Sequence, residues 1–153
     1  MPKALFLDRD GTINVDHGYV YRIEDFELIP GIIELCTRAQ ELGYLIIVIT
    51  NQSGIARGYY TEEDYTRLTQ HMLGEFAARG INITAVYHCP ELSGPNRKPE
   101  PGLFFAAQRQ YGIDMAASIS AGDKPRDVEA GQKAGCGRNF LYSNDFTPII
   151  QAL

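Results

Sequence analysis

The sequence lacks several features that would place it in a large class of proteins. No stretch approaches the roughly 20 consecutive apolar residues that a transmembrane helix needs, and the N-terminus has no long apolar segment typical of secretory signals. Internal repeats, low-complexity tracts and Gly/Ser-rich linkers are also missing. With 44% hydrophobic residues, the chain can build one substantial core. We therefore expect a single cytoplasmic domain over residues 1–153, with no membrane partner.

Cysteine is scarce and scattered. The three cysteines, Cys36, Cys89 and Cys136, form no CxxC pair, and an odd number cannot all pair within one chain. Disulfides form and persist mainly in oxidising compartments. Reduced thiols in a reducing compartment are therefore the simpler interpretation.

Positive charge is also in deficit, because 14 Lys and Arg face 19 Asp and Glu, for a net charge of -5. Nucleic-acid binding depends on a basic face that neutralises phosphates, so the composition argues against such a partner. An anionic substrate must instead meet a locally positive site. Neither a GxGxxG nor a Walker A sequence is present. An EF-hand loop needs glycine at its sixth position. If Asp8 is the first position, Gly11 is the fourth, so an EF-hand is excluded.

Short apolar runs alternate with helical patterns along the chain. The runs predict strands at Ala4–Leu7, Leu45–Ile49, Ile83–Tyr87, Ser118–Ala121 and Asn139–Tyr142. Apolar spacing and capping signals predict helices over Ile32–Leu42, from after Thr61 to near Gly80, over Pro101–Tyr111 and over Asp127–Ala134. This alternation predicts an α/β, Rossmann-like three-layer sandwich with a mainly parallel five-stranded sheet. Residues 15–29 are too few for a large cap domain, and we expect a hairpin-like flap there.

Two carboxylates follow the first predicted strand, in the segment Asp8-Arg9-Asp10-Gly11-Thr12. Residues two apart in an extended chain point the same way, and open parallel sheets bind ligands beyond the carboxyl ends of their strands. A carboxylate is a competent nucleophile toward phosphorus, and its neighbour can protonate a leaving oxygen and then activate water. Because carboxylate and phosphate repel each other, the site needs a cation, and hard oxygen ligands select Mg²⁺. Asp123, after the fourth strand, can supply another such ligand.

Each of these pieces also has an ordinary structural interpretation. Asp and Gly favour turns, and Thr50 is compatible with a simple strand end. Arg97 and Lys98 are compatible with a solvated pair. We interpret Asp127 as a charge at a helix N-terminus or a partner of a ligand, rather than a direct metal ligand. No triad-like spacing to a nucleophile is found for His17, His71 and His88.

Together, the segments resemble the haloacid dehalogenase-like phosphohydrolase superfamily. Its pattern is Asp-x-Asp-Gly-Thr, a strand-terminal Thr or Ser, a Lys, and Gly-Asp with a further acidic residue. The pattern is matched in order by Asp8 to Thr12, Thr50, Lys98, and Gly122-Asp123 with Asp127.

A finer resemblance rests on longer segments: Asp8–Asn14 with Asp16–Val20, Thr50–Gly58, Arg97-Lys98-Pro99 and Gly122-Asp123-Lys124. In these segments the chain looks like the D-glycero-D-manno-heptose 1,7-bisphosphate 7-phosphatases, which serve ADP- or GDP-heptose biosynthesis. Histidinol-phosphate phosphatases share the DRDGT and RKP elements, but we expect Gln-Asp-Gly and Gly-Asp-Arg there, where this chain has Gln52-Ser53-Gly54 and Gly122-Asp123-Lys124. The heptose interpretation is preferred. A histidinol-phosphate or broader small-molecule phosphatase is the alternative, and a noncatalytic phosphate-binding module is a third class.

The resemblance implies a role for each matching residue. Asp8 would attack phosphorus, and Asp10 would protonate the leaving sugar oxygen and later activate water. Mg²⁺ would be held by the Asp8 carboxylate, the Asp10 backbone carbonyl and Asp123, while Thr50 and Lys98 would bind the transferring phosphoryl oxygens. The sugar phosphate would be contacted by Asp16, His17, Tyr19, Asn51, Ser53, Arg57, Arg97 and Lys124. Arg97 is the residue we expect at the far phosphate or sugar, and we expect a monomer because no long apolar patch is evident.

One departure concerns a zinc-binding loop of three Cys and one His that many such proteins carry before the RKP segment. Here Cys89 alone remains of the cysteines, and His88 precedes it rather than following Pro90. A structural zinc site needs four ligands. We therefore expect no zinc.

Overall fold

Five strands form one sheet in the order β3-β2-β1-β4-β5 in the computed structural model, which describes residues 1–153. Every neighbouring pair is parallel. The central β1, buried along its whole length, lies between β2 and β4. The strands are β1 at Ala4–Leu7, β2 at Leu45–Asn51, β3 at Ala85–Cys89, β4 at Ile119–Gly122 and β5 at Arg138–Leu141.

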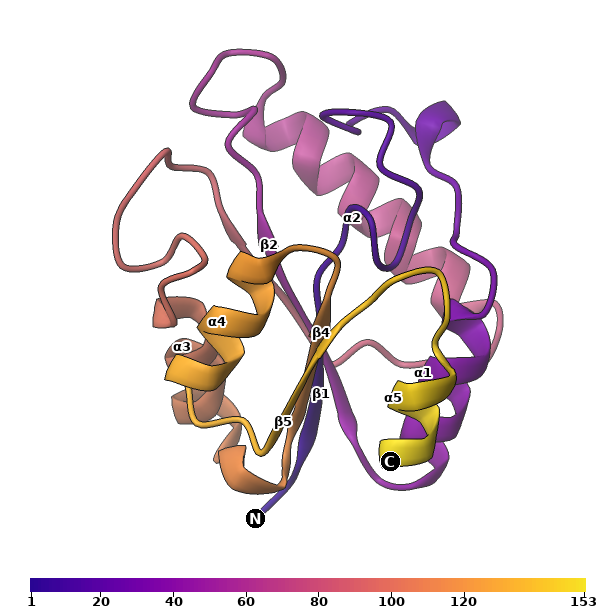
Figure 1. The fold of residues 1–153 in the computed structure, drawn as a ribbon. Coiled ribbons are helices and arrows are strands. Elements are labelled where there is room, and N and C mark those ends of the chain that lie inside the picture. Colours follow the sequence, from indigo (N-terminus) through magenta and orange to yellow (C-terminus); the bar gives the residue numbers. More distant parts are fainter.

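Helices cover both faces of the sheet, which confirms the predicted three-layer α/β sandwich (Figure 1). Successive side chains of a strand point to opposite faces, so Leu5 and Leu7 join one core and Ala4 and Phe6 the other. The first core includes residues of α1, α2 and α5, and the second includes residues of α3 and α4. These helices span Ile32–Glu41 (α1), Glu62–Ala77 (α2), Gly102–Tyr111 (α3), Pro125–Lys133 (α4) and Thr147–Ala152 (α5). None of them has the length and apolar character of a membrane-spanning helix.

Local signals account for two of the helix starts. Thr61 Oγ1 accepts from the Asp64 N–H at 3.1 Å while the Asp64 carboxylate accepts from the Thr61 N–H at 2.9 Å, so α2 begins in a capping box. Pro125 opens α4, where its missing N–H costs nothing. The carboxylate of Asp127 accepts from the Lys124 N–H at 3.0 Å, which caps the same helix. This agrees with the interpretation of Asp127 as a charge at a helix N-terminus.

Several element limits differ from the expectation. The second strand extends two residues further, because Thr50 and Asn51 pair with His88 and Cys89. The third strand is correspondingly shifted to Ala85–Cys89. An apolar run cannot reveal such polar strand ends. The fourth helix starts at Pro125 rather than Asp127, α2 ends at Ala77, before Gly80, and α5 was not predicted.

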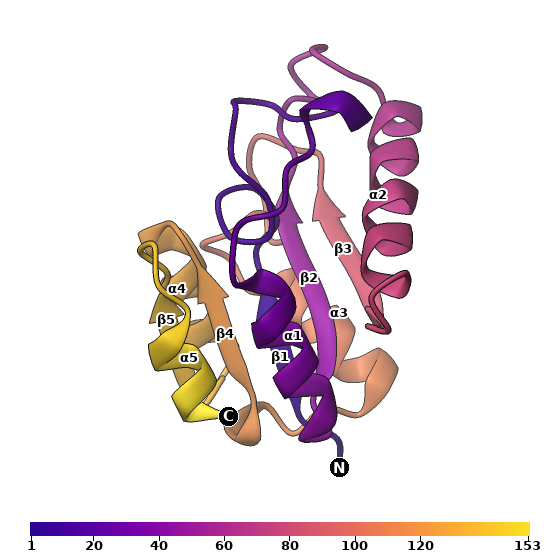
Figure 2. The ribbon, with the colours of Figure 1, turned by 90° about the vertical axis from the view of Figure 1, so that its right-hand side faces the viewer.

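The flap, residues 15–29, lies over the carboxyl end of the sheet beside the loop that follows β2 (Figure 2). It is less regular than a hairpin: an antiparallel bridge joins Asn14 to Leu28, and Ile23–Asp25 forms a 3₁₀ turn. Its first residue, Val15, donates its N–H to the Glu27 carbonyl at 2.8 Å. These contacts hold the two ends of the flap together near the end of β1.

Candidate active site

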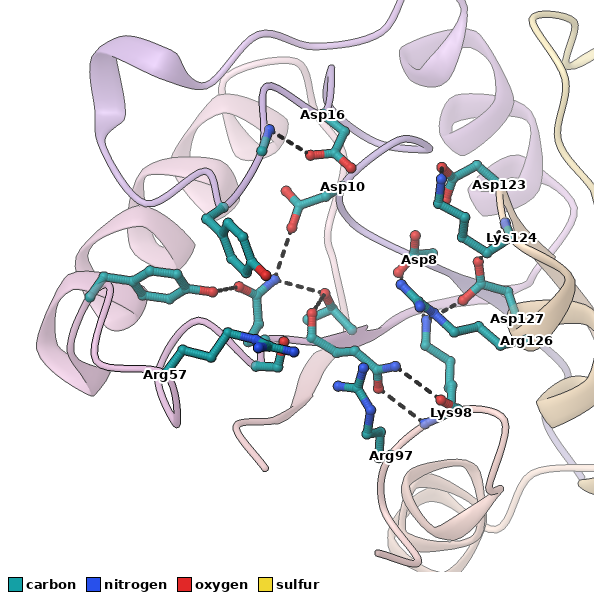
Figure 3. Close-up of a pocket in the computed structure, with 17 residues that line it drawn as sticks. Asp8, Asp10, Asp16, Arg57, Arg97, Lys98, Asp123, Lys124, Arg126 and Asp127 are labelled. Atoms are coloured by element: carbon teal, nitrogen blue, oxygen red, sulfur yellow. Dashed lines mark hydrogen bonds and ion pairs between the residues drawn. The ribbon is translucent and has the colours of Figure 1, made fainter. Parts of the chain in front are cut away.

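A cavity of about 320 Å³ opens beyond the carboxyl ends of the central strands (Figure 3). All predicted site residues line it except His17, whose imidazole instead lies 3.2 Å from the Glu27 carboxylate. The lining also includes Gly18, Gln52, Tyr60 and Arg126, which we did not predict as site residues, and Asp127. Segments distant in the sequence thus converge on one polar cavity.

Lys98 is buried at the centre of this cavity, with 3% of its side chain exposed. Its Nζ lies 2.9 Å from Asp8 Oδ1 and 2.7 Å from Asp127 Oδ1, and it donates to the Ile49 carbonyl at 2.6 Å. These contacts occupy the three donors of an ammonium group. Burial alone would lower the pKa of Lys98, but the two carboxylates outweigh it and raise that pKa. Lys98 therefore stays positively charged and partly neutralises Asp8.

The surroundings of Asp8 disfavour the ionised form of its carboxyl. Burial raises the pKa of its carboxyl well above the usual range; Lys98 opposes this shift, and repulsion from Asp127 and Asp123 adds to it. Carboxylate oxygens of Asp8, Asp123 and Asp127 all lie within 4.8 Å of one another. With one ammonium among three carboxylates, the cluster keeps an excess of negative charge.

This cluster fits a divalent cation. Asp123 Oδ1 is buried and has no hydrogen-bond partner, while the Lys124 Nζ is 3.7 Å from its other oxygen. Both oxygens of Asp127 are already engaged, one by Lys98 and one by the Lys124 N–H. Asp8 and Asp123 therefore remain as the carboxylates with oxygens available to a hard metal ion such as Mg²⁺.

Gly11 allows this approach of two loops. Its φ of 91° is in the left-handed region that favours glycine, and a Cβ there would lie 2.2 Å from Asp123 Oδ2. The glycine of the Asp-x-Asp-Gly-Thr segment is thus needed both for its backbone conformation and for the space it leaves to Asp123.

The Asp10 carboxylate points away from Asp8 and Asp123 (Figure 3). It accepts four hydrogen bonds. Arg9 donates to both of its oxygens, each at 3.0 Å, in a bidentate pair. The side chains of Asn14 and Gln52 donate at 2.9 and 3.0 Å. Arg9 is itself 1% exposed and donates to the Val20 carbonyl of the flap at 2.7 Å. The carboxylate of Asp10 is therefore held in one orientation.

Thr50 and Asn51, at the end of β2, have different surroundings. Thr50 Oγ1 accepts from the Gln52 amide at 2.9 Å at the cavity wall. The Asn51 amide instead binds the main chain of Lys98: its Nδ2 donates to the Lys98 carbonyl at 3.1 Å, and its Oδ1 accepts from the Lys98 N–H at 3.0 Å. Asn51 thus fixes the segment that carries the buried lysine.

Four further cations line the cavity on separate loops: Arg57, Arg97, Lys124 and Arg126 (Figure 3). None of the three arginines forms an ion pair, and Arg97 makes one long hydrogen bond, 3.4 Å, to the Glu91 carbonyl. Arg126 extends from the first turn of α4 toward the cavity centre. A more accurate helix start would have identified it, because the first turn of α4 faces the site. The cavity is thus suited to an anion with more than one charged group.

The flap and the neighbouring loop complete the wall. Asp16 accepts from the Gly18 N–H at 2.9 Å, and Tyr19 has a positive φ of 49°. The ring of Tyr19 meets that of Tyr59 edge to face, with centroids 4.8 Å apart. Ser53 also lines the cavity.

Comparison with known proteins agrees with this geometry. A family model described as haloacid dehalogenase-like hydrolase matches residues 4–135. The chain belongs to this hydrolase family.

Named relatives point to one kind of substrate. A D-glycero-alpha-D-manno-heptose-1,7-bisphosphate 7-phosphatase of Burkholderia mallei is 48% identical over 149 residues, covering 91% of this chain and 79% of the relative. A D-glycero-beta-D-manno-heptose-1,7-bisphosphate 7-phosphatase of Photorhabdus laumondii is 45% identical, covering 90% of this chain and 79% of the relative. The D,D-heptose 1,7-bisphosphate phosphatase of B. bronchiseptica, solved with magnesium and phosphate, superposes with a TM-score of 0.82 at 30% identity, covering 89% of this chain and 78% of that structure.

Proposed function

We propose that this chain is a Mg²⁺-dependent phosphatase that removes the 7-phosphate of D-glycero-D-manno-heptose 1,7-bisphosphate. The observation that carries the proposal is a buried Asp8, paired with Lys98, at the base of a cavity lined by four further cations. The relatives named for this reaction, with 43–49% identity, support the choice of substrate. The lining is almost wholly polar, with two hydrophobic residues among 17, which suits a hydroxylated and doubly anionic sugar.

The reaction divides into two displacements. An Asp8 carboxylate oxygen attacks phosphorus while the bond from phosphorus to the sugar oxygen breaks, and a protonated Asp10 gives its proton to that leaving oxygen. One of the four donors that now bind the Asp10 carboxylate must move aside for this proton. In the second displacement Asp10 takes a proton from water, the water oxygen attacks the aspartyl phosphate, and the Asp8 carboxylate is released with inorganic phosphate. Thr50 and Lys98 would stabilise the charge on the transferring phosphoryl oxygens, although Lys98 must share donors that now bind Asp8, Asp127 and Ile49.

The carboxylates of Asp8 and Asp123, with the backbone carbonyl of Asp10, would hold Mg²⁺. When bound, this ion neutralises charge between nucleophile and phosphate, which otherwise repel each other. The excess negative charge of the acidic cluster and the unpartnered Asp123 Oδ1 support this assignment.

The second phosphate would be met by cations outside the reaction centre. Arg57, Arg97, Lys124 and Arg126 are placed for this, and we assign Arg97 to the far phosphate. We expect Arg97→Ala to raise KM for a bisphosphate more than for a monophosphate, because the monophosphate has no second anionic group to lose a contact. Equal increases for both substrates would contradict the assignment.

We place this activity in the cytoplasm, in the supply of nucleotide-activated heptose for glycans such as lipopolysaccharide. The compartment is supported by three free, buried cysteines, because disulfides are rare in reducing compartments.

The decisive experiment is a phosphate-release screen with Mg²⁺ against both anomers of the heptose bisphosphate, histidinol phosphate and an aryl phosphate. We expect the heptose bisphosphates to give the highest kcat/KM. Fastest turnover of histidinol phosphate would overturn the substrate assignment. No release of phosphate by folded, Mg²⁺-loaded protein would favour a noncatalytic phosphate-binding module, and normal turnover by Asp8→Asn would exclude Asp8 as the nucleophile.

A further inference from the structure

We infer that Gln52 is a positioning residue for the Asp10 carboxyl, and that it acts on the step in which the leaving oxygen is protonated. The inference rests on the proposed phosphatase function and assigns a residue that the sequence did not single out. Its basis is the hydrogen-bond network around Gln52, which lies in the loop directly after β2 and is 2% exposed.

The side-chain amide of Gln52 makes every hydrogen bond it can. Its Nε2 donates to Asp10 Oδ2 at 3.0 Å and to Thr50 Oγ1 at 2.9 Å (Figure 3). Its Oε1 accepts from Arg9 at 3.3 Å and from the hydroxyl of Tyr60. A primary amide has two N–H donors and two acceptor lone pairs, so all four are used.

These partners fix which way the amide points. A flipped amide would place its NH₂ group against the Arg9 guanidinium and its carbonyl against the Asp10 carboxylate, and both contacts would be repulsive. Arg9 therefore orients Gln52, while both residues donate to the same Asp10 oxygen. Arg9, Thr50 and Tyr60 are buried, so removing the amide costs each of them a hydrogen bond that water does not readily replace. Asp10 keeps its donors Arg9 and Asn14 but loses its connection to Thr50 and Tyr60.

The network also connects Asp10 to two walls of the cavity. Tyr60 belongs to the loop after β2, and its ring stacks on Tyr21 of the flap with centroids 5.3 Å apart. Arg9 reaches the flap directly at the Val20 carbonyl. Gln52 lies where these connections meet. Its amide therefore fixes the position of the Asp10 carboxyl relative to the cavity walls that would contact the sugar.

The chemical consequence depends on the leaving group. A sugar alkoxide is a poor leaving group, so its departure requires a proton from Asp10 as the bond to phosphorus breaks. A 4-nitrophenolate ion departs without that proton. A misplaced Asp10 should therefore slow the first displacement for the sugar phosphate and leave it nearly unchanged for the aryl phosphate. Loss of the Thr50 contact alone would slow both, because phosphoryl oxygens are common to the two substrates.

The test compares kcat/KM of Gln52→Leu for the heptose bisphosphate and for 4-nitrophenyl phosphate. The value of kcat/KM depends only on the steps up to and including the first irreversible displacement. It therefore does not depend on the later step in which Asp10 acts as a base. Gln52→Leu also loses the Thr50 contact, which slows both substrates alike. Since a positioned general acid contributes about 10²- to 10⁴-fold, we expect kcat/KM to fall about 10- to 100-fold more for the sugar phosphate than for the aryl phosphate.

Two further variants keep the test decisive. Gln52→Asn retains a polar amide but withdraws it from Asp10, so it should show the same discrimination with less risk to folding. Gln40→Leu is the control for the loss of a hydrogen-bonded amide outside the cavity: the exposed Gln40 of α1 donates to the Gly80 carbonyl and accepts from the Asn82 N–H. It should leave both substrates unaffected.

Equal losses for the two substrates in a folded Gln52 variant would overturn the inference, as would unchanged kinetics in both variants. If the wild-type protein hydrolyses neither substrate, the proposed function itself fails. If the wild type is active but the losses are equal, the role of Gln52 alone is rejected.

Discussion

Replacing Lys98 with methionine should destabilise the protein strongly as well as inactivate it. The Lys98 ammonium lies between two buried carboxylates, 2.9 Å from Asp8 and 2.7 Å from Asp127. Methionine keeps much of the side-chain length but removes the charge and all three donors. The variant then holds Asp8 and Asp127 close together with no cation between them.

The size of the effect follows from this burial. Removing one partner of a buried ion pair costs about 3–5 kcal/mol. At about 2–4 °C per kcal/mol for a domain of this size, a loss of about 4 kcal/mol lowers Tm by about 8–16 °C. If Lys98 also stabilises the transferring phosphoryl group, kcat should fall by about 10²- to 10³-fold.

The assay is thermal unfolding followed by circular dichroism in the presence of EDTA, at several pH values. In the variant, the Asp8 carboxyl loses the Lys98 charge that opposes its raised pKa, so this pKa in the folded state lies still further above its unfolded value. The folded state then binds more protons, so stability rises as the pH falls through the raised folded pKa of Asp8 toward its unfolded pKa. The difference in Tm between Lys98→Met and the wild type should therefore become smaller as the pH is lowered.

A second variant tests the same reasoning without changing the pH. Lys98→Met combined with Asp127→Asn removes one of the two repelling carboxylates, so it should be more stable than Lys98→Met alone. A Lys98→Met protein that unfolds at the wild-type temperature would refute the argument. So would a loss of stability that neither lower pH nor the Asp127 substitution reduces.

Three other outcomes are expected. Arg126→Ala should raise KM for the bisphosphate about tenfold, because a charge-assisted hydrogen bond is worth about 1.5–3 kcal/mol, and an unchanged KM would remove Arg126 from the binding site. Gly11→Ala should destabilise by more than about 1 kcal/mol and increase the Mg²⁺ concentration needed for half-maximal activity, because its Cβ would displace Asp123; titration of activity with Mg²⁺ checks this. Burial raises the pKa of the Cys36 and Cys136 thiols to about 12, so a thiol-specific chromogenic reagent should react with them only after unfolding, and rapid labelling of native protein would contradict the burial.

Much of the site was predictable because parallel strands bring their carboxyl ends together. Once Asp8, Thr50 and Asp123 are assigned to strand ends, their convergence follows from the fold. The carboxylate pair two residues apart did not predict that Asp8 and Asp10 would have separate partners, Lys98 for one and Arg9 for the other. Those partners depend on side-chain directions that the sequence pattern does not contain.

The residues that the sequence missed share a physical reason. Gln52, Tyr60 and Arg126 are in loops or a first helical turn, where no periodicity indicates the direction of a side chain. Gln52 acts through a network that only the folded chain assembles. His17 shows the opposite case, because the resemblance implied that it contacts the sugar phosphate, whereas the flap directs it toward Glu27.

The clamp between Asn51 and the main chain of Lys98 has a consequence for how such proteins can vary. Two hydrogen bonds fix the lysine to the end of β2, so its position does not depend on the length of the loop that precedes it from β3. Residues 90–96 can therefore be shortened or extended, at a small cost in loop entropy, without moving the ammonium away from Asp8. Links of different lengths between β3 and Lys98 can then support the same catalytic centre.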